Sequence, residues 1–138
     1  EDLSELDLAY APPFNTANDL VNMASFVGLN HISGYSPLKS PSEVLNEIAG
    51  NNGLILDVRT MGEHGKAPLA DVLHIPADEI RDRLDEIPRD RTLYLLSKDG
   101  FLGHTVLQIL KASGIRSVYN IAGGYSAARW FPGWNFDA

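Results

Sequence analysis

The chain has 138 residues, of which 44% are hydrophobic and 21% charged, as expected for one folded domain with a short extension. Its formal net charge is -7, and residues 1–34 contain five acidic residues but no Lys or Arg. The acidic chain lacks the basic stripe that binds a phosphate backbone, so we predict no nucleic-acid partner. Because there is no cysteine, disulfide bonds, thiolate metal sites and thiol catalysis are excluded for this sequence.

The apolar segments of the sequence are short. No apolar run approaches the ~20 residues of a membrane span, and no basic region followed by an apolar stretch marks an export signal. We therefore predict no membrane partner and a cytoplasmic location.

The first segment, residues 1–34, differs from the rest of the chain in composition as well as in charge. Pro12 and Pro13 force an extended backbone, and residues 18–28 then have the spacing of a helix with one apolar face. No other part of the segment would cover that face. We therefore interpret the segment as separate from the domain that follows, and its helix as lacking a partner surface.

A helix and a strand are predicted between residues 40 and 58. Ser40, Pro41 and Glu43 indicate a helix start, because they supply an N-cap, a first-turn proline and a capping-box glutamate. The sequence Gly-Asn-Asn-Gly at 50–53 ends this helix. Residues 54–58 are a short apolar run between turn residues, which predicts a strand buried on both faces.

The remaining chain continues to alternate between helix and strand patterns. Residues 77–87 have apolar residues at helical spacing and are closed by Pro88, which predicts a helix. The later predicted elements are a strand over 92–96, a helix from Gly103 or His104 to about Ser113 with Gly114 at its C-cap, a strand over 118–121, and a short helix opened by Gly123 and Gly124. This alternation predicts an α/β fold with a parallel sheet.

The segment Ser97–His104 connects a predicted buried strand to a predicted helix start. Backbone N–H groups in such a connection converge with the helix dipole into a cradle for an anion. The candidate cradle residues are Ser97, Lys98, Asp99, Gly100, Phe101, Leu102, Gly103 and His104. The alternative is that Ser97 and Asp99 only cap the strand end and the helix start.

Four groups of residues, spread in order over about a hundred positions, resemble the successive motifs of the rhodanese family. They are residues 54–59 with Glu63, the pair Ile75-Pro76, residues 93–97 and residues 120–125. Their number and order make the resemblance more specific than any single motif. The resemblance implies a rhodanese-like α/β domain over residues 35–138, with a central parallel sheet of about five strands and helices on both faces.

In active members of that family the loop begins with a cysteine, whose thiolate accepts a sulfane sulfur and passes it on. Ser97 stands at this position, and a hydroxyl lacks the nucleophilicity of a thiolate. Leu102 replaces an arginine that often closes the loop, and Ala67-Pro68-Leu69 replaces the usual Gly-His-Ile. Because several positions differ, natural loss of sulfur transfer is favoured over one engineered substitution. The Asp99 carboxylate would in addition repel an anionic donor or occupy the loop amides itself.

Residues 6–14 and 18–24 resemble the C-terminal end of the dimerisation domain of coenzyme A-disulfide reductases and related NADH oxidases. In that family a flavoprotein reductase is often followed by a rhodanese domain. Residues 1–34 are therefore interpreted as the end of a reductase dimerisation domain plus linker, and the reductase domain of the same parent chain as the partner. The resemblance implies FAD and NAD(P)H in the parent, no cofactor in this part, and a homodimeric parent. Tyr10 would match a tyrosine near the partner subunit's active site, but simple packing of its ring onto a neighbour is the favoured interpretation in this segment.

Three polar residues, Asp57, Arg59 and Glu63, end or follow the first strand of the domain and are expected to support the loop as framework residues. The four histidines are His31, His64, His74 and His104. None lies four residues from another or beside a thiolate, so we predict no metal site. His74 is expected at a strand edge.

The leading hypothesis is a rhodanese-homology domain of a flavin-dependent disulfide or persulfide reductase. It would be inactive in sulfur transfer and would bind a small anionic or sulfur-containing ligand or regulate the reductase. The alternative is an active thiosulfate or persulfide sulfurtransferase domain with cysteine at position 97, seen here as a Cys-to-Ser variant. A phosphatase-like or serine-nucleophile enzyme is a third class, but no His and Asp are recognisably placed to activate Ser97.

Overall fold

The computed structural model describes residues 20–50 and 52–137. The chain divides into two compact units, Glu1–Pro37 and Leu38–Ala138. In the first unit the helix α1 spans Leu20–Ile32, so it continues beyond the predicted end at residue 28. The motif over residues 6–14, Tyr10 included, lies outside the described residues.

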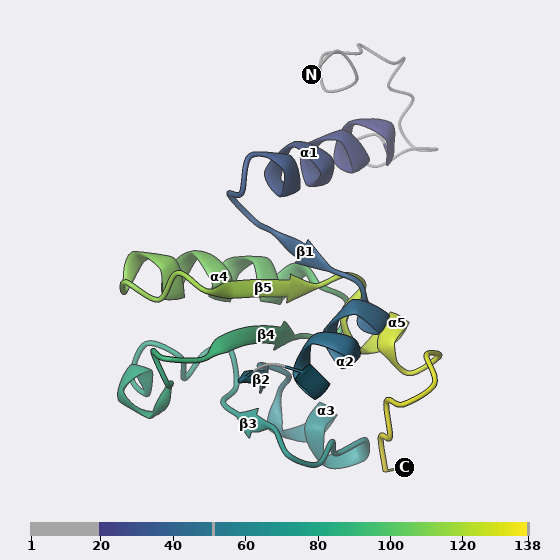
Figure 1. The fold of residues 1–138 in the computed structure, drawn as a ribbon, viewed down its shortest axis with the longest axis vertical. Helices are drawn as coiled ribbons and strands as arrows, with labels where there is room; N and C mark the ends of the chain where they lie inside the picture. Colours follow the sequence, from purple (N-terminus) through teal and green to yellow (C-terminus); the bar gives the residue numbers. More distant parts are fainter. Residues whose placement is uncertain (1–19, 51, 138) are drawn as a thin grey trace. The chain divides into compact units, whose positions relative to one another are not determined.

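The second unit is built on one sheet of five strands that all run parallel, in the order β1-β5-β4-β2-β3 (Figure 1). The strands are β1 (Leu38–Lys39), β2 (Gly53–Asp57), β3 (Leu73–His74), β4 (Thr92–Leu96) and β5 (Val118–Ile121). The predicted five-stranded parallel sheet is confirmed, and the bounds of β4 and β5 match the prediction. Because all strands are parallel, their carboxyl ends meet at one edge of the sheet, where α/β proteins bind ligands.

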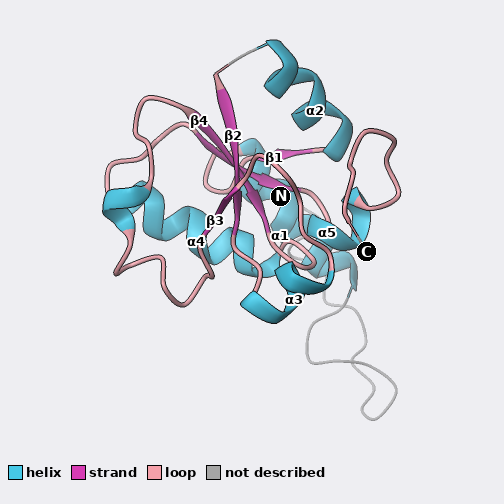
Figure 2. Ribbon diagram, turned by 90° about the horizontal axis from the view of Figure 1, so that it is seen from below, coloured by secondary structure: helices cyan, strands magenta, loops and turns pink. Residues whose placement is uncertain are grey.

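Helices cover both faces of this sheet, as predicted. The helices are α2 (Pro41–Gly50), α3 (Met61–Lys66), the 3-10 turn η1 (Leu84–Glu86), α4 (Phe101–Ala112) and α5 (Gly124–Ala128). Helix α4 lies on one side of the strands and α2 on the other (Figure 2). The capping box predicted for α2 is present, since Ser40 Oγ accepts from the Glu43 N–H and Glu43 accepts from the Ser40 N–H.

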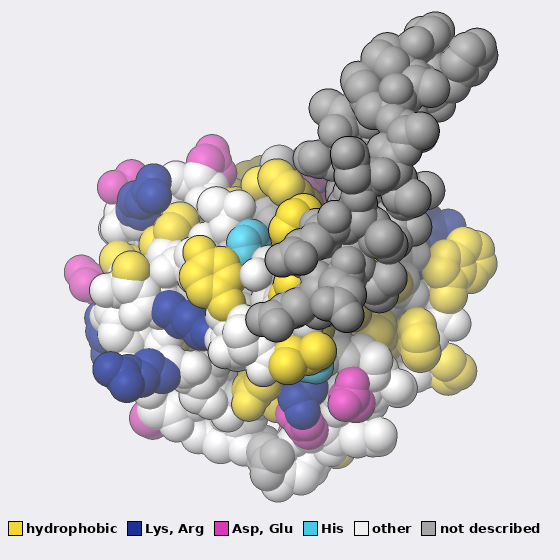
Figure 3. Space-filling model, turned by 90° about the horizontal axis from the view of Figure 1, so that it is seen from above, with side chains coloured by type: hydrophobic (Ala, Val, Ile, Leu, Met, Phe, Trp, Pro, Cys, Tyr) yellow, Lys and Arg dark blue, Asp and Glu magenta, His cyan; other side chains and the backbone are white. Residues whose placement is uncertain are grey.

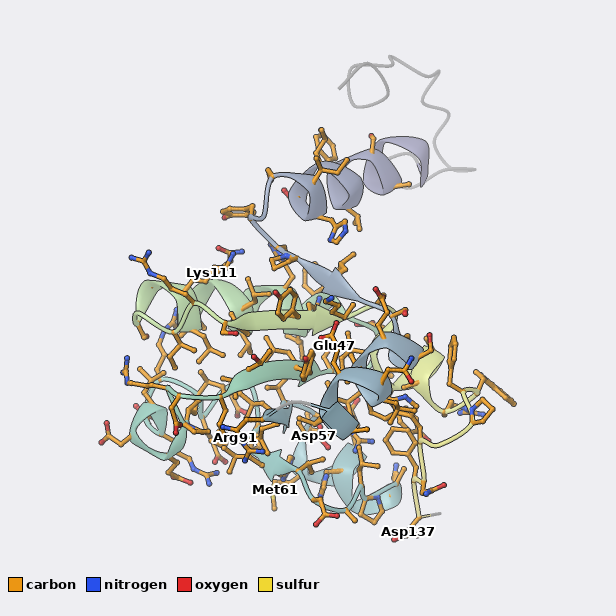
Figure 4. All side chains as sticks on the ribbon, viewed as in Figure 1. Glu47, Asp57, Met61, Arg91, Lys111 and Asp137 are labelled. Atoms are coloured by element: carbon orange, nitrogen blue, oxygen red, sulfur yellow. The ribbon has the colours of Figure 1, made fainter. Side chains whose placement is uncertain are left out.

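The core has two layers because neighbouring side chains of a buried strand point to opposite faces. Leu93 and Leu95 pack with Leu107 of α4 on one face. Tyr94 and Leu96 pack with the α2 and α5 side on the other. The hydroxyl of Tyr94 donates to Glu47 Oε2 at 2.5 Å, and Glu47 lies on α2 (labelled in Figure 4), so this part-buried polar contact fastens α2 to the sheet.

The helix predicted over residues 77–87 is wrong. Most hydrogen bonds of this segment join residues three apart, as in Glu79 N–H to Pro76 C=O, and only η1 is regular. Ile80 and Ile87 are nevertheless buried as predicted. A series of tight turns places apolar residues at intervals of three to four as a helix does, so the spacing alone did not distinguish them.

Other differences concern short elements. The residues Leu38–Lys39 form the edge strand β1, and β1, α3 and β3 were not predicted. A strand of two residues has no detectable alternation, so its position depends on pairing with distant residues. Helix α4 starts at Phe101 rather than at 103 or 104, and Phe101, Leu102, Gly103 and His104 therefore form its first turn.

The surface carries both signs of charge. On the face shown in Figure 3, described Lys and Arg side chains are interspersed with acidic and hydrophobic ones. Within residues 20–50 and 52–137, no helix is both long enough and apolar enough to cross a membrane.

Candidate functional site

Ser97 follows the last residue of β4 and is completely buried, with 0% of its surface exposed. Its Oγ accepts a hydrogen bond from the Gly100 N–H at 2.9 Å. The loop therefore folds around the hydroxyl, as the capping interpretation of Ser97 requires. The same position would place a cysteine sulfur among the loop amides.

The first turn of α5 determines which way the loop peptides face. The Tyr125 N–H donates to the Ser97 carbonyl at 2.7 Å, and the Ser126 N–H donates to the Lys98 carbonyl at 2.9 Å. In a planar trans peptide the C=O and the following N–H point in opposite directions. The N–H groups of Lys98 and Asp99 are thereby turned away from α5.

Gly124 allows the start of α5 to lie this close to the Ser97 carbonyl. A Cβ at this position would lie 2.3 Å from the Ser97 carbonyl oxygen, and Gly124 has a φ of +54°. Only glycine tolerates both the contact and the left-handed backbone without strain. The pair of glycines at 123–124 thus serves the loop through backbone contact.

The Asp99 carboxylate occupies part of the loop. Its Oδ1 accepts from the Phe101 N–H at 3.0 Å, at the start of α4. Within the described residues, the N–H groups of Leu102 and Gly103 have no hydrogen-bond partner, whereas the His104 N–H donates to the Gly100 carbonyl. The cradle therefore has free amides beside one that a side chain of the loop itself occupies.

The outer side of the loop is apolar. Phe101 is 74% exposed and Leu102 is also exposed. The Nζ of Lys98 lies 3.9 Å from Glu63 Oε1, a long contact between an exposed and a partly exposed side chain that adds little stability. Leu102 gives no cation where the family arginine would stand, so Lys98 is the exposed cation of this loop.

Asp57 and Arg59 form a buried ion pair at the end of β2. Arg59 Nη2 lies 2.6 Å from Asp57 Oδ2 and also donates to the Ala67 carbonyl at 3.0 Å. The guanidinium lies 4.9 Å from the Tyr125 ring centre and 5.4 Å from that of Phe136. Burial opposes ionisation of Asp57, but hydrogen bonds from Arg59 and His64 outweigh it and hold its pKa below the ordinary value.

His64 and His74 join this pair. His64 Nδ1 lies 2.9 Å from Asp57 Oδ2, and His74 Nε2 lies 2.9 Å from the Arg59 carbonyl oxygen. The two imidazole rings stack, with centres 4.0 Å apart and planes 11° apart. His74 lies in β3, a strand at the edge of the sheet that was not predicted.

The cluster of Asp57, His64 and His74 has residue types that bind metals, with ligand atoms within 4.8 Å of one another. Sequence spacing did not indicate this cluster, because the three residues come from β2, α3 and β3. The geometry does not favour a metal ion. Face-to-face rings cannot both direct an in-plane lone pair at one ion, and Asp57 is already neutralised by Arg59. The absence of a metal site therefore stays a prediction.

The candidate residues divide between the two faces of the sheet. Ser97 faces Gly103 of α4, whereas Arg59 packs on Tyr125 of α5. Tyr125 links the two groups, since its N–H binds the Ser97 carbonyl and its ring covers Arg59. Asp57 and Arg59 thus support the loop indirectly (Figure 4 labels Asp57).

Glu63 does not join the Asp57–Arg59 pair. Its carboxylate accepts from the Thr60 N–H, and Thr60 accepts from the Glu63 N–H, which forms the capping box of α3. The order Thr60 to Glu63 could have indicated this helix start from the sequence.

The family model for the rhodanese-like domain matches residues 40–129. The chain belongs to the rhodanese-like family. The match covers the strands β2 to β5, the loop after β4 and the helix α5, so Ser97 lies within the matched part of the chain.

Two solved structures are similar to this rhodanese-like chain. CoADR-RHD from Bacillus anthracis, in its reduced form, has 34% identity and a TM-score of 0.82, and the match covers 92% of this chain and 22% of that one. An NAD-dependent persulfide reductase from A. fulgidus has 36% identity and a TM-score of 0.75, with 94% of this chain and 22% of that one covered. The chain thus spans about a fifth of these larger chains, and its neighbours are rhodanese domains of reductases.

Among curated proteins, a sulfurtransferase from Allochromatium vinosum is 31% identical over 74 residues, which cover 54% of this chain and 69% of that protein. The chain is therefore related both to sulfurtransferases and to the rhodanese domains of disulfide and persulfide reductases. This relationship covers the family and the fold.

Proposed function

We propose that residues 35–138 are the rhodanese-homology domain of a flavin-dependent disulfide or persulfide reductase, and that the domain does not transfer sulfur. The observation that carries the proposal is Ser97 at the centre of the loop, together with the absence of any cysteine. Sulfur transfer through a persulfide needs a thiolate, and a serine hydroxyl forms no corresponding transferable link to sulfane sulfur.

The loop favours a binding or regulatory role. It keeps N–H groups without partners at Leu102 and Gly103, so a small anionic or sulfur-containing ligand has donors to bind. The Asp99 carboxylate at Phe101 weakens that binding by repulsion. The expected ligand affinity is therefore low, as suits a regulatory contact.

The reductase domain of the same parent chain is the proposed partner. Both larger neighbours contain a rhodanese domain within a longer reductase chain, which supports this assignment. FAD and NAD(P)H would belong to the reductase part, and no residue of the present chain is assigned to either. A homodimeric parent and a cytoplasmic location complete the proposal.

An active sulfurtransferase with cysteine at position 97 is the alternative. It is favoured by the intact support of the loop, because Gly124, the amides of α5 and the buried hydroxyl position are arranged around residue 97. The codon for residue 97 in the parent gene separates the two. A serine-nucleophile enzyme is disfavoured, because the imidazole nearest to a carboxylate, His64 on Asp57, belongs to the opposite face from Ser97.

The test combines turnover and binding. The chain is assayed for thiosulfate sulfurtransferase activity and titrated calorimetrically with thiosulfate, sulfate and coenzyme A. The proposal expects no turnover and weak binding of at least one of these anions. Sulfur transfer by the unaltered chain would overturn the inactive role, and the absence of any binding would overturn the ligand role.

A further inference from the structure

Asn120 connects the middle of the sheet to the loop after β4. It lies in β5, opposite Leu38 and Leu95 of the neighbouring strands, and is 3% exposed. Its side-chain Nδ2 donates to the Gly100 carbonyl at 2.8 Å. A buried side-chain amide in a strand of this sheet therefore holds a peptide group of the loop.

The other half of the Asn120 amide points at Gly103. Its Oδ1 is buried and has no hydrogen-bond partner among the described residues. A Cβ on Gly103 would lie 2.1 Å from this oxygen and 3.3 Å from Ser97 Oγ. Asn120 therefore lies against α4 so closely that only glycine fits at position 103.

These contacts fix the peptides on both sides of Gly100. The Gly100 N–H is bound to Ser97 Oγ, and the Gly100 carbonyl is bound to Asn120 and the His104 N–H. Gly100 has a φ of +97°, a conformation that glycine adopts without steric cost. Because the C=O and the next N–H point in opposite directions, the carbonyl held by Asn120 turns the Phe101 N–H away from the sheet.

We propose that Asn120 is the positioning residue of the anion loop, and that Gly103 is the counterpart that leaves room for it. Asn120 acts on the peptide before α4 as the α5 amides act on the peptides after Ser97: each binds a carbonyl and so fixes the direction of the next N–H. After Gly100 that N–H belongs to Phe101, where Asp99 binds it next to the free amides of Leu102 and Gly103. The inference rests on the proposed binding function of this loop. In this role Asn120 orients a peptide of the loop but does not itself contact the ligand.

The experiment compares Asn120→Asp with Asn46→Asp. The first variant keeps the size of the side chain but replaces the donor to Gly100 with a carboxylate oxygen, and the second makes the same chemical change on an exposed position of α2. The measurements are ¹H–¹⁵N spectra of the loop amides, thermal unfolding, and thiosulfate titration. We expect shifted Gly100 and Phe101 resonances and binding weakened about tenfold in Asn120→Asp, with Asn46→Asp unchanged.

Two further variants keep the inference testable if Asn120→Asp does not fold. Asn120→Ser adds no charge, and its shorter side chain can no longer donate to the Gly100 carbonyl. Gly103→Ala places a Cβ on α4 that displaces the Asn120 amide. Both should shift the same loop amides while the amides of β4 keep their positions. A purely structural role would lower the unfolding temperature without moving the loop resonances or the affinity.

The outcomes separate this inference from the proposed function. If the unaltered chain binds thiosulfate and the folded Asn120 variants bind it equally well with unchanged loop spectra, the positioning role is wrong and the binding function stands. If the unaltered chain binds no anion, the binding function is wrong. In that case the spectra alone decide the positioning role, which an unmoved Gly100 or Phe101 resonance in the Asn120 variants would overturn.

Discussion

The loop after β4 and the polar cluster after β2 lie at the same edge of the sheet but are built in opposite ways. The cluster depends on side chains: Asp57 and Arg59 pair directly, and His64 and His74 extend the pair. The loop depends on backbone groups whose directions are fixed by neighbouring elements. A framework of side chains fails when one partner is removed, whereas a backbone cradle keeps its shape and changes its chemistry with the side chains it carries at positions 97, 99 and 102.

The largest expected effect comes from breaking the side-chain cluster. Arg59→Met removes the partner of a buried carboxylate, and breaking such a pair on one side costs about 3–5 kcal/mol of unfolding free energy. Urea unfolding followed by circular dichroism measures the loss. The double variant Asp57→Leu/Arg59→Met should recover part of it, because no unpaired charge remains. Equal destabilisation by the single and the double variant would contradict the comparison.

The next largest loss of stability is expected from substituting Gly124, the glycine that packs against the loop. Gly124→Ala forces a Cβ against the Ser97 carbonyl in a left-handed conformation, and should cost more than about 2 kcal/mol. Gly62→Ala is the matched control, since a Cβ there meets nothing within 4 Å and the site is helical. It should be neutral or stabilising by about 0.5–1 kcal/mol in the same thermal melts. Equal destabilisation by both variants would contradict the conclusion that the contact with the Ser97 carbonyl requires glycine at position 124.

Acid should weaken the side-chain cluster specifically. The pKa of Asp57 in the folded chain lies below its ordinary value of 3.8, so its contribution to stability is fully present above that value. The contribution is lost as the pH falls through the lowered folded pKa. Urea unfolding between about pH 6 and about pH 2 should show that the unfolding free energy decreases less with acid in Asp57→Asn than in the unaltered chain. The exposed control Asp78→Asn should lose as much unfolding free energy with acid as the unaltered chain. The same pH dependence of the unfolding free energy in all three proteins would contradict the role of Asp57.

The smallest effect tests the chemistry of the cradle without disturbing its shape. Asp99→Asn keeps an oxygen for the Phe101 N–H but removes the charge beside the anion. Thiosulfate should bind about fivefold more tightly, since two unit charges 4 Å apart in water interact by ~1 kcal/mol. Calorimetric titration measures the change. Unchanged affinity would place the Asp99 carboxylate away from the ligand.

The sequence predicted the long buried strands well because each is an uninterrupted apolar run bounded by turn residues. The bounds of β4 and β5 follow from that pattern alone. Residues 77–87 show the limit of periodicity, since turns placed Ile80 and Ile87 in the core without a helix. The strands β1 and β3 are too short for any pattern and are defined by the neighbours they pair with.

The site was predicted unevenly for a similar reason. The loop was found because a strand followed by a helix start has few possible arrangements. Asn120 and Tyr125 were seen as part of a motif, but their contacts to Gly100 and Arg59 join elements far apart in the sequence. Glu63 was grouped with Asp57 and Arg59 as a framework residue, whereas Thr60, three residues before it, indicates its local role in the capping box of α3.

The most direct test of the central claim is the thiosulfate sulfurtransferase activity of Ser97→Cys, with spectra showing that the variant is folded. The triple variant Ser97→Cys/Asp99→Asn/Leu102→Arg serves as the reference, because it also removes the carboxylate and restores the loop cation. The account predicts that Ser97→Cys alone stays inactive, since Asp99 still binds the Phe101 N–H and Leu102 offers the donor no charge. Full activity in Ser97→Cys would contradict it, and would identify the domain as a sulfurtransferase that lacks only its thiol.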